Sequence, residues 1–103
     1  MKPTSAFFLC VAFAATPSLG FASQALAQQK NCLACHAAAT RVVGPSFKEI
    51  AAKYATQDDA VAQLSERIIK GSTGRWGFVP MPPNAQVSPD ESKALTEWIL
   101  QQK

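Results

Sequence analysis

Two cysteines and the only histidine of the chain lie together at Cys32, Cys35 and His36, in the order C-x-x-C-H. Thiols at this spacing can bond to the two vinyl groups of one porphyrin, and the adjacent imidazole then reaches the iron from one face. A redox disulfide of the thioredoxin type would require alternating strands and helices, which the sequence does not indicate. A zinc site would require four ligands, and Cys10 is the only other Cys or His. The motif therefore predicts one covalently attached haem c, with its iron.

The second axial ligand of that iron cannot be another histidine of the same chain, so methionine, lysine, water or no ligand remain. Met81 lies in the segment Val79-Pro80-Met81-Pro82-Pro83-Asn84, where the prolines restrict the backbone. A single methionine is more commonly core filler. Here, however, no helix is expected to carry it, and a rigid loop is well suited to presenting one soft sulfur. We therefore expect His36 and Met81 to be the axial ligands.

The N-terminal segment has the parts of a secretory signal peptide. Lys2 precedes an apolar run over residues 7–15, and small and helix-breaking residues follow. The run is too short to span a bilayer of ~30 Å, so we expect no stable membrane insertion. We expect cleavage after Ala22, with cleavage after Ala27 as the alternative, because Ala25-Leu26-Ala27 also matches the peptidase rule. Residues 1–22 are then the signal peptide and residues 23–103 form one domain.

Four segments of that domain carry helix signals and none carries a strand pattern, which predicts an all-α fold. Ser46 and Ser88 are expected N-caps, and Glu91 completes a capping box with Ser88. Asp58 or Asp59 is expected to begin a helix that Gly71 ends. The expected helices cover residues 23–31, 47–54, 58 or 59 to 70, and 89 onward, and the last should bury Ala94, Leu95, Trp98 and Ile99.

The segments between these helices are expected to be loops. Residues 31–44 show no usable periodicity, and residues 71–87 are dense in glycine and proline, which indicates a long functional loop. The expected mature chain has nine Lys and Arg against seven Asp and Glu, dispersed along the sequence. This small net charge gives no indication of nucleic-acid binding.

Several motifs in order resemble the short bacterial class I monohaem cytochromes c of the cytochrome c-551 type, over residues 23–103. Besides the C-x-x-C-H motif, they are Val43-Gly44-Pro45, Gly71-Ser72-Thr73-Gly74, Trp76-Gly77, Pro80 to Asn84 and the final helix with Trp98. The resemblance implies the cytochrome c fold, with about four short helices wrapped around one covalently attached haem.

The resemblance also implies roles for individual residues. The Pro45 carbonyl should accept a hydrogen bond from the second ring nitrogen of His36. Arg67 and Trp76 should reach a haem propionate, and Asn84 should help to hold the Met81 loop. Two positions depart from the family: Arg75 adds a cation beside Trp76, and Phe78 stands where proline is common.

The function implied is a periplasmic electron carrier, not an enzyme, working as a monomer with respiratory redox enzymes such as a nitrite reductase, a terminal oxidase or a dehydrogenase. One alternative is a dedicated cytochrome subunit of a periplasmic dehydrogenase complex. The other is a haem enzyme with an open sixth coordination site. Apolar residues near the attachment and methionine segments should be half core and half docking rim, bordered by Lys30, Arg41 and Arg75: Leu33, Val42, Val43, Phe78, Val79, Pro82 and Pro83.

Overall fold

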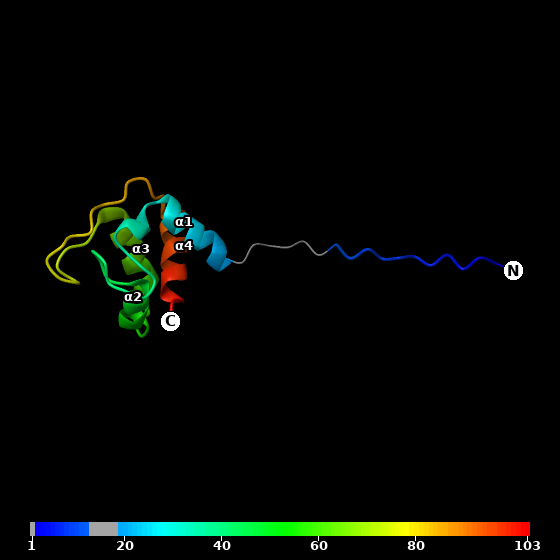
Figure 1. Cartoon of the computed structure of the whole chain (residues 1–103), viewed down its shortest axis with the longest axis horizontal. Helices are drawn as coiled ribbons and strands as arrows, with labels where there is room; N and C mark the ends of the chain where they lie inside the picture. The colour runs from blue at the N-terminus through cyan, green and yellow to red at the C-terminus, as the bar shows by residue number, and fades with distance from the viewer. Residues whose placement is uncertain (1, 13–18) are drawn as a thin grey trace.

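The structure, a computed structural model, describes residues 2–12 and 19–103 of the chain, and its regular structure is helical. Along the chain come α1 (Leu19–Gln29), a 3-10 helix η1 (Cys32–Ala34), α2 (Phe47–Tyr54), α3 (Ala60–Lys70) and α4 (Pro89–Leu100) (Figure 1). Within the described ranges, extended pairing is limited to two isolated bridges, His36 with Arg41 and Ser72 with Met81. The all-α prediction is confirmed.

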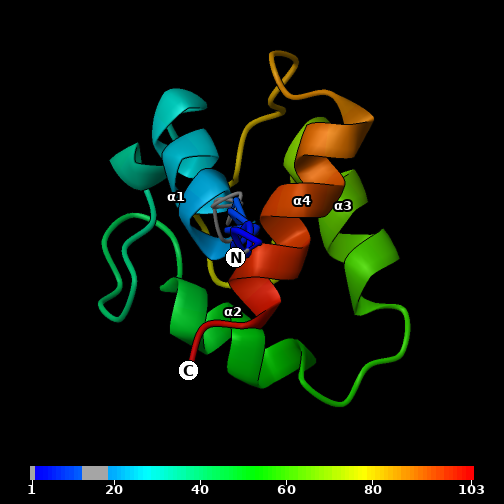
Figure 2. The same cartoon turned by 90° about the vertical axis from the view of Figure 1, so that its right-hand side faces the viewer.

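Helix α4 is the centre of the packing, because α1, α2 and α3 all contact it (Figure 2). Its Leu95 is 1% exposed and its Ile99 is buried beside it. These two side chains belong to one apolar core with Ala27 of α1, Phe47 of α2 and Ile68 of α3. Trp76 and Met81, from the loop between α3 and α4, pack against this core from outside.

Capping boxes fix where α2 and α4 begin; the sequence predicts the box at Ser88, but at Ser46 it predicts only the N-cap. The Ser46 hydroxyl accepts from the Glu49 amide at 3.1 Å, and the Ser46 amide donates to the Glu49 carboxylate at 2.7 Å. Ser88 and Glu91 repeat this exchange at 3.0 and 3.1 Å, with Pro89 in the first turn of α4. The third helix has Asp59 at its N-cap position, but the Asp59 side chain makes no capping hydrogen bond.

Three features of the helices differ from the sequence-based expectation. Helix α1 begins at Leu19, four residues before the expected start, and ends at Gln29, two residues before the expected end. The segment Cys32–Ala34, expected to be loop, forms a 3-10 turn. Such short 3-10 turns lack the periodicity by which longer helices are recognised.

The buried face of α4 also differs from the predicted stripe. Ala94 and Trp98 are only half-buried, whereas the polar Ser92 and Thr96 are both 0% exposed. Ser92 Oγ donates to the Ser65 carbonyl at 2.6 Å, and Ser65 Oγ donates to Thr96 Oγ1 at 3.2 Å. Small hydroxyl side chains thus line the contact between α3 and α4 with their hydrogen bonds satisfied, which a search for apolar periodicity cannot detect.

The long loop between α3 and α4 is ordered by its two ends. At the first end, Gly71 has a φ of 84°, and a Cβ there would lie 2.7 Å from the Met81 carbonyl oxygen, so only glycine fits this close approach. At the other end, Val87 is 4% exposed and its amide donates to the Asn84 carbonyl at 3.1 Å. The loop is therefore fastened to the helices on both sides of Met81.

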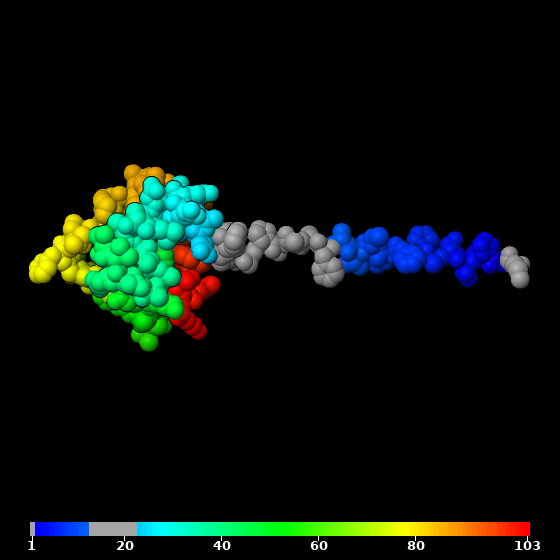
Figure 3. All heavy atoms as spheres, in the orientation of Figure 1, coloured from blue at the N-terminus to red at the C-terminus, as the bar shows by residue number. Residues whose placement is uncertain are grey.

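Residues 2–12 form neither helix nor strand and are exposed throughout; Figure 3 shows them apart from the helices. Residues 13–18, which hold the end of the expected apolar run and the breakers after it, lie outside the described residues. Both expected cleavage positions, Ala22 and Ala27, fall within the range of α1. In the part of the chain that the structure describes, no helix has the length and apolar character needed to cross a membrane.

The packing predicts that Val87→Ala destabilises the protein by about 2 kcal/mol, because it removes two buried methyl groups and leaves a cavity beside α4. Val42→Ala deletes the same atoms from a side chain that is 58% exposed, so it should stay within about 0.5 kcal/mol of the unchanged protein. Denaturant unfolding of the two haem-loaded variants measures both values. Equal effects would contradict the assignment of Val87 to the core.

Candidate cofactor site

All eight residues expected to hold the cofactor line one cavity of about 520 Å³ between the helices and the two long loops. They come from positions up to 52 residues apart in the chain: Cys32, Cys35, His36, Pro45, Arg67, Trp76, Met81 and Asn84. Much of the rest of the lining is apolar and includes Phe47, Leu64 and Ile68. A volume of this order lies in the range of small-molecule and cofactor sites.

The attachment segment presents its two cysteines from the 3-10 turn and the residue after it. The amides of Cys35 and His36 both donate to the Cys32 carbonyl, at 3.2 and 3.0 Å. Cys32 and Cys35 are half-buried and not joined by a disulfide, and burial raises the pKa of the Cys32 thiol. A thioredoxin-type centre needs a lowered thiol pKa, so Cys32 does not have the character of a disulfide-exchange thiol.

The His36 ring is fixed on one nitrogen and on one face. Its Nδ1 lies 2.7 Å from the Pro45 carbonyl oxygen, the pair that the family resemblance predicts. Since the carbonyl can only accept, this contact places the ring proton on Nδ1 and leaves the Nε2 lone pair free for a metal. Phe47 stacks on the ring with centroids 5.6 Å apart and planes at 25°.

Gly44 and Phe47 were not predicted to act on the site, yet both touch His36. A Cβ at Gly44 would lie 2.7 Å from Cε1 of the ring and 3.0 Å from Nδ1, so the imidazole occupies the space that a side chain would need. The Gly44 amide also donates to the Cys35 carbonyl at 2.9 Å. In the sequence, Gly44 is marked by its place in the family motif Val43-Gly44-Pro45. Phe47 has no such signal, because its pattern indicates only a core residue.

Met81 is held by backbone pairing and by Asn84. Its amide donates to the Ser72 carbonyl at 2.8 Å, and its carbonyl accepts from the Ser72 amide at 3.0 Å. The Asn84 amide group donates to the Ile68 carbonyl at 2.8 Å and to the Pro82 carbonyl at 3.3 Å. Asn84 therefore ties the loop just after Met81 to the end of α3.

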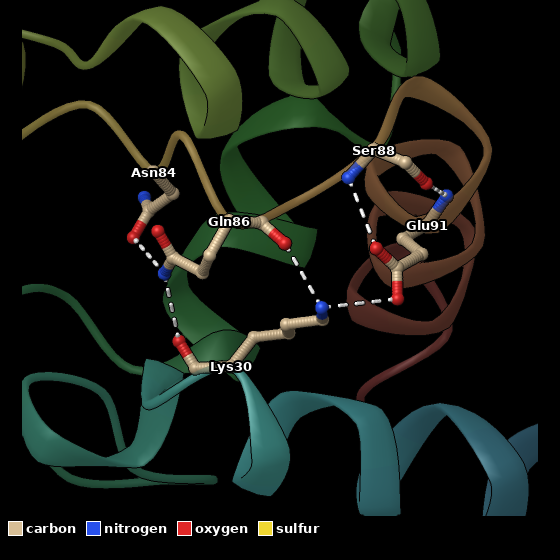
Figure 4. Close-up of polar contacts among 5 residues, drawn as sticks. All are labelled: Lys30, Asn84, Gln86, Ser88 and Glu91. Carbon is tan, nitrogen blue, oxygen red and sulfur yellow. Dashed lines mark hydrogen bonds and ion pairs between the residues drawn. The ribbon is translucent and has the colours of Figure 1, made fainter.

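A polar cluster joins this loop to the end of α1 and the start of α4 (Figure 4). Lys30 Nζ donates to the Gln86 carbonyl at 2.9 Å and lies 3.3 Å from the Glu91 carboxylate. Gln86 Nε2 in turn donates to Asn84 Oδ1 at 3.2 Å and to the Lys30 carbonyl at 3.3 Å. Lys30, just before the cysteine segment, is thus connected to Asn84 and Gln86, just after Met81, although the two segments are more than 50 residues apart in the sequence.

The contact between Glu91 and Lys30 in this cluster depends on the protonation of the Glu91 carboxyl and therefore on pH. Hydrogen bonding from the Ser88 amide, followed by the contact with Lys30, lowers the pKa of the Glu91 carboxyl. A lowered folded-state pKa stabilises the fold above the unfolded-state pKa, and the contribution is lost as pH falls through the lowered value. The contact between α4 and Lys30 should therefore weaken only in acid.

Arg67 and Trp76, expected at the cofactor's propionates, both line the cavity but already have protein partners. Arg67 donates to the Tyr54 hydroxyl and, at 2.9 Å, to Gln63 Oε1. Trp76 Nε1 has no hydrogen bond of its own among those found in the described structure, while its ring is approached by Arg41 and Lys53. Tyr54 and Lys53 are additions to the site that nothing in the sequence pattern indicated.

The residues present fit a covalently attached haem. Two thiols lie beside an imidazole with one free nitrogen, a thioether lines the same cavity, and Arg67 supplies a half-buried cation where a propionate could pair. Elsewhere in the described ranges, no group of three or more His, Cys, Asp or Glu side chains is arranged to hold a metal ion.

The close contact at Gly44 predicts that Gly44→Ala displaces the His36 ring and destabilises the haem-loaded protein by about 1–3 kcal/mol, as overpacking does. Denaturant unfolding followed at the haem absorption band measures this. Val42→Ala, two residues away at an exposed position outside the cavity lining, is the control and should leave the unfolding midpoint in place. A Gly44→Ala protein as stable as this control would show that the His36 ring lies elsewhere.

Comparison with known proteins agrees with this chemistry. The Cytochrome c family model matches residues 22–103. The chain is 56% identical over 75 residues to cytochrome c-552 of Nitrosomonas europaea, covering 73% of each chain. It is 52% identical over 80 residues to cytochrome c-551 of Pseudomonas aeruginosa, covering 78% of this chain and 76% of that protein. With cytochrome c-552 of Hydrogenobacter thermophilus it shares 46% identity over 93 residues, covering 90% and 94%.

The fold agrees as well. The crystal structure of Nitrosomonas europaea cytochrome c552 superposes with a TM-score of 0.76 and 54% identity, covering 78% of this chain and 99% of that one. The predicted fold and the prediction of one covalently bound haem c are thereby confirmed. The chain therefore belongs to the cytochrome c family, as a small c-type cytochrome that carries electrons and is not an enzyme.

Proposed function

We propose that this cytochrome shuttles single electrons through a haem whose iron is bound by His36 and Met81. The observation that carries the proposal is the shared cavity, in which the ring of His36 has one nitrogen engaged by Pro45 and the Met81 backbone is paired with Ser72. The haem, when bound, supplies the change between ferrous and ferric iron. The protein's part is to attach it through Cys32 and Cys35 and to hold both ligands still.

Ligation on both faces would leave the iron no open position for a substrate, which suits electron transfer through the haem edge. The hydrogen bond from Nδ1 to Pro45 raises the basicity of His36 and fixes its orientation. A methionine ligand raises the reduction potential, which suits a carrier placed late in a respiratory chain. A haem enzyme would instead need an open site and a nearby acid or base, and the chain has no second histidine to serve.

We further propose that the protein acts in the periplasm as a monomeric carrier between respiratory enzymes, such as a dehydrogenase on one side and a nitrite reductase or a terminal oxidase on the other. Support comes from the signal-like N-terminal segment and from the similarity to bacterial cytochromes c-551 and c-552. A dedicated subunit of a periplasmic dehydrogenase complex would use the same haem chemistry and is the alternative.

The surface available to such partners combines apolar and cationic residues. Of the seven apolar residues expected around the haem, Val43, Phe78, Val79 and Pro82 line the haem cavity, and Leu33, Val42 and Pro83 are exposed outside it. Val42 and Val43 are exposed in the attachment-side loop, close in sequence to Arg41. An apolar surface bordered by cations suits brief contacts with acidic redox partners.

The proposed ligation predicts that Met81→Ala keeps the covalent haem but lowers the reduction potential and opens the iron to carbon monoxide. The thioether is lost and no other residue of the loop can replace it as a ligand of similar softness. Potentiometry and carbon monoxide titration of the purified protein measure the two effects.

Thr73→Ala is the matched control, since it truncates an exposed side chain of the same loop that does not line the cavity. It should change neither property. A Met81→Ala protein that still excludes carbon monoxide and keeps its potential would show that the ligand is another group.

The proposed export predicts a mature chain that begins at Ser23. Cleavage after Ala22 keeps Ser23 and Ala27, which are 7% and 1% exposed and lie against the core. Cleavage after Ala27 would remove both residues and leave α1 only its last two residues. Mass spectrometry of the haem-loaded periplasmic protein decides between the two. A mature chain starting at Gln28 would contradict the proposal.

A further inference from the structure

Two cations from segments far apart in the sequence meet at Trp76. Lys53, on α2, has its Nζ 4.2 Å from the centroid of the Trp76 ring and donates to the Arg75 carbonyl at 3.2 Å. Arg41, in the loop before α2, donates from Nη1 to the Trp76 carbonyl at 3.1 Å, with its Cζ 5.8 Å from the ring centroid. Two consecutive carbonyls and one aromatic ring are therefore held by two side chains.

Both cations are anchored to the same helix. Glu49, in the first turn of α2, lies 3.8 Å from Arg41 and also accepts from the Ser46 amide at 2.7 Å. Lys53 follows Glu49 by four residues, so it lies one turn further along the same helix. The rigid start of α2 thus supports the contacts to Arg75 and Trp76.

The loop that they hold, residues 72–81, has few other contacts with the polypeptide: Trp76 and Met81 pack against the core, and much of the rest of the loop lines the haem cavity. Its two ends are joined by the hydrogen bonds between Ser72 and Met81. Among the residues described, the hydrogen bonds that reach residues 73–80 from outside the loop are those of Arg41 and Lys53. Gly74 and Phe78 line the haem cavity, and no other part of the polypeptide lies within 4 Å of the place that a Cβ would take at Gly77. Only Trp76 within the segment 73–80 is partly buried.

We propose that Lys53 and Arg41 are positioning residues: they fasten the 72–81 loop across the mouth of the haem cavity and hold Trp76 in its wall. Met81 ends this loop, and Trp76 and Arg41 line the cavity, whereas Lys53 does not. Lys53 therefore acts on the electron-transfer site only through the loop. The inference rests on the haem occupying that cavity, but it does not depend on which group is the second iron ligand.

The physical basis is the sum of four modest interactions, two with carbonyls and two with the Trp76 ring. A cation over an indole ring and charge-assisted hydrogen bonds to carbonyls each contribute little at an exposed site. Because they act on adjacent residues of one loop, they are lost together when the loop lifts. Removing the two interactions of Lys53 should raise the population of the lifted loop by about tenfold.

Limited trypsin digestion of the haem-loaded protein tests this directly, because the Arg75–Trp76 bond lies between the two carbonyls that the cations hold. Cleavage of this bond requires the loop to lift, so its rate follows the lifted population when opening is fast. Lys53→Met should speed appearance of the fragment that ends at Arg75 by about tenfold, and Arg41→Met should act in the same direction.

Lys48→Met is the matched control, since it removes the same charge from the same helix at an exposed position with no side-chain contact among those found. It should leave the cleavage rate unchanged. Lys53→Arg should restore slow cleavage, because a guanidinium can donate to the carbonyl and lie over the ring. In the ferric protein, the NMR resonance of the Trp76 indole proton should move in Lys53→Met and return in Lys53→Arg.

Equal cleavage rates in Lys48→Met and Lys53→Met would overturn the proposal, as would a failure of Lys53→Arg to restore either the rate or the Trp76 resonance. These readouts need only the attached haem. A protein whose second ligand proved not to be Met81 would therefore still test the role of Lys53, and the two proposals can fail separately.

Discussion

The hydrogen bond between His36 Nδ1 and the Pro45 carbonyl is the constraint around which the site is built. It assigns the ring proton to one nitrogen and leaves the other for the iron. Phe47 supports one face of the ring, and Gly44 leaves the space that the ring occupies. Because Phe47 also packs edge-on against Trp98 of α4, at 5.0 Å between centroids, the orientation of His36 is connected to the core of the protein.

The second half of the site is held quite differently, because the Met81 loop has neither a helix nor a sheet to support it. Its backbone is fastened at Ser72, at Asn84 and, through Lys30 and Gln86, at the end of α1. Each fastening uses polar groups, which a small apolar core cannot replace. The His36 ring is thus fixed by one hydrogen bond and by packing against Phe47, whereas the segment around Met81 is fixed by a larger set of hydrogen bonds together with the packing of Met81 against the core.

Much of this arrangement could be predicted from the sequence, where local chemistry determines local structure. The N-caps Ser46 and Ser88 indicated the starts of α2 and α4, and the C-x-x-C-H motif indicated the cofactor. The rest depends on contacts between distant segments. The buried hydroxyls of Ser92 and Thr96 lie where an apolar pattern shows nothing, and Lys53 acquires its role only when the loop of residues 72–81 comes to lie beside α2. The full exposure of Phe78 likewise follows from where that loop projects, which no local pattern contains.

The central claim is that His36 and Met81 together close the coordination of a covalently attached haem. The near-infrared absorption spectrum of the unmodified ferric protein tests it most directly, because bonding between a methionine sulfur and ferric haem iron gives a weak charge-transfer band in that region. The account predicts this band at neutral pH, together with a haem that stays bound to the polypeptide after denaturation. A covalently bound haem whose ferric form lacks the band at neutral pH would contradict it.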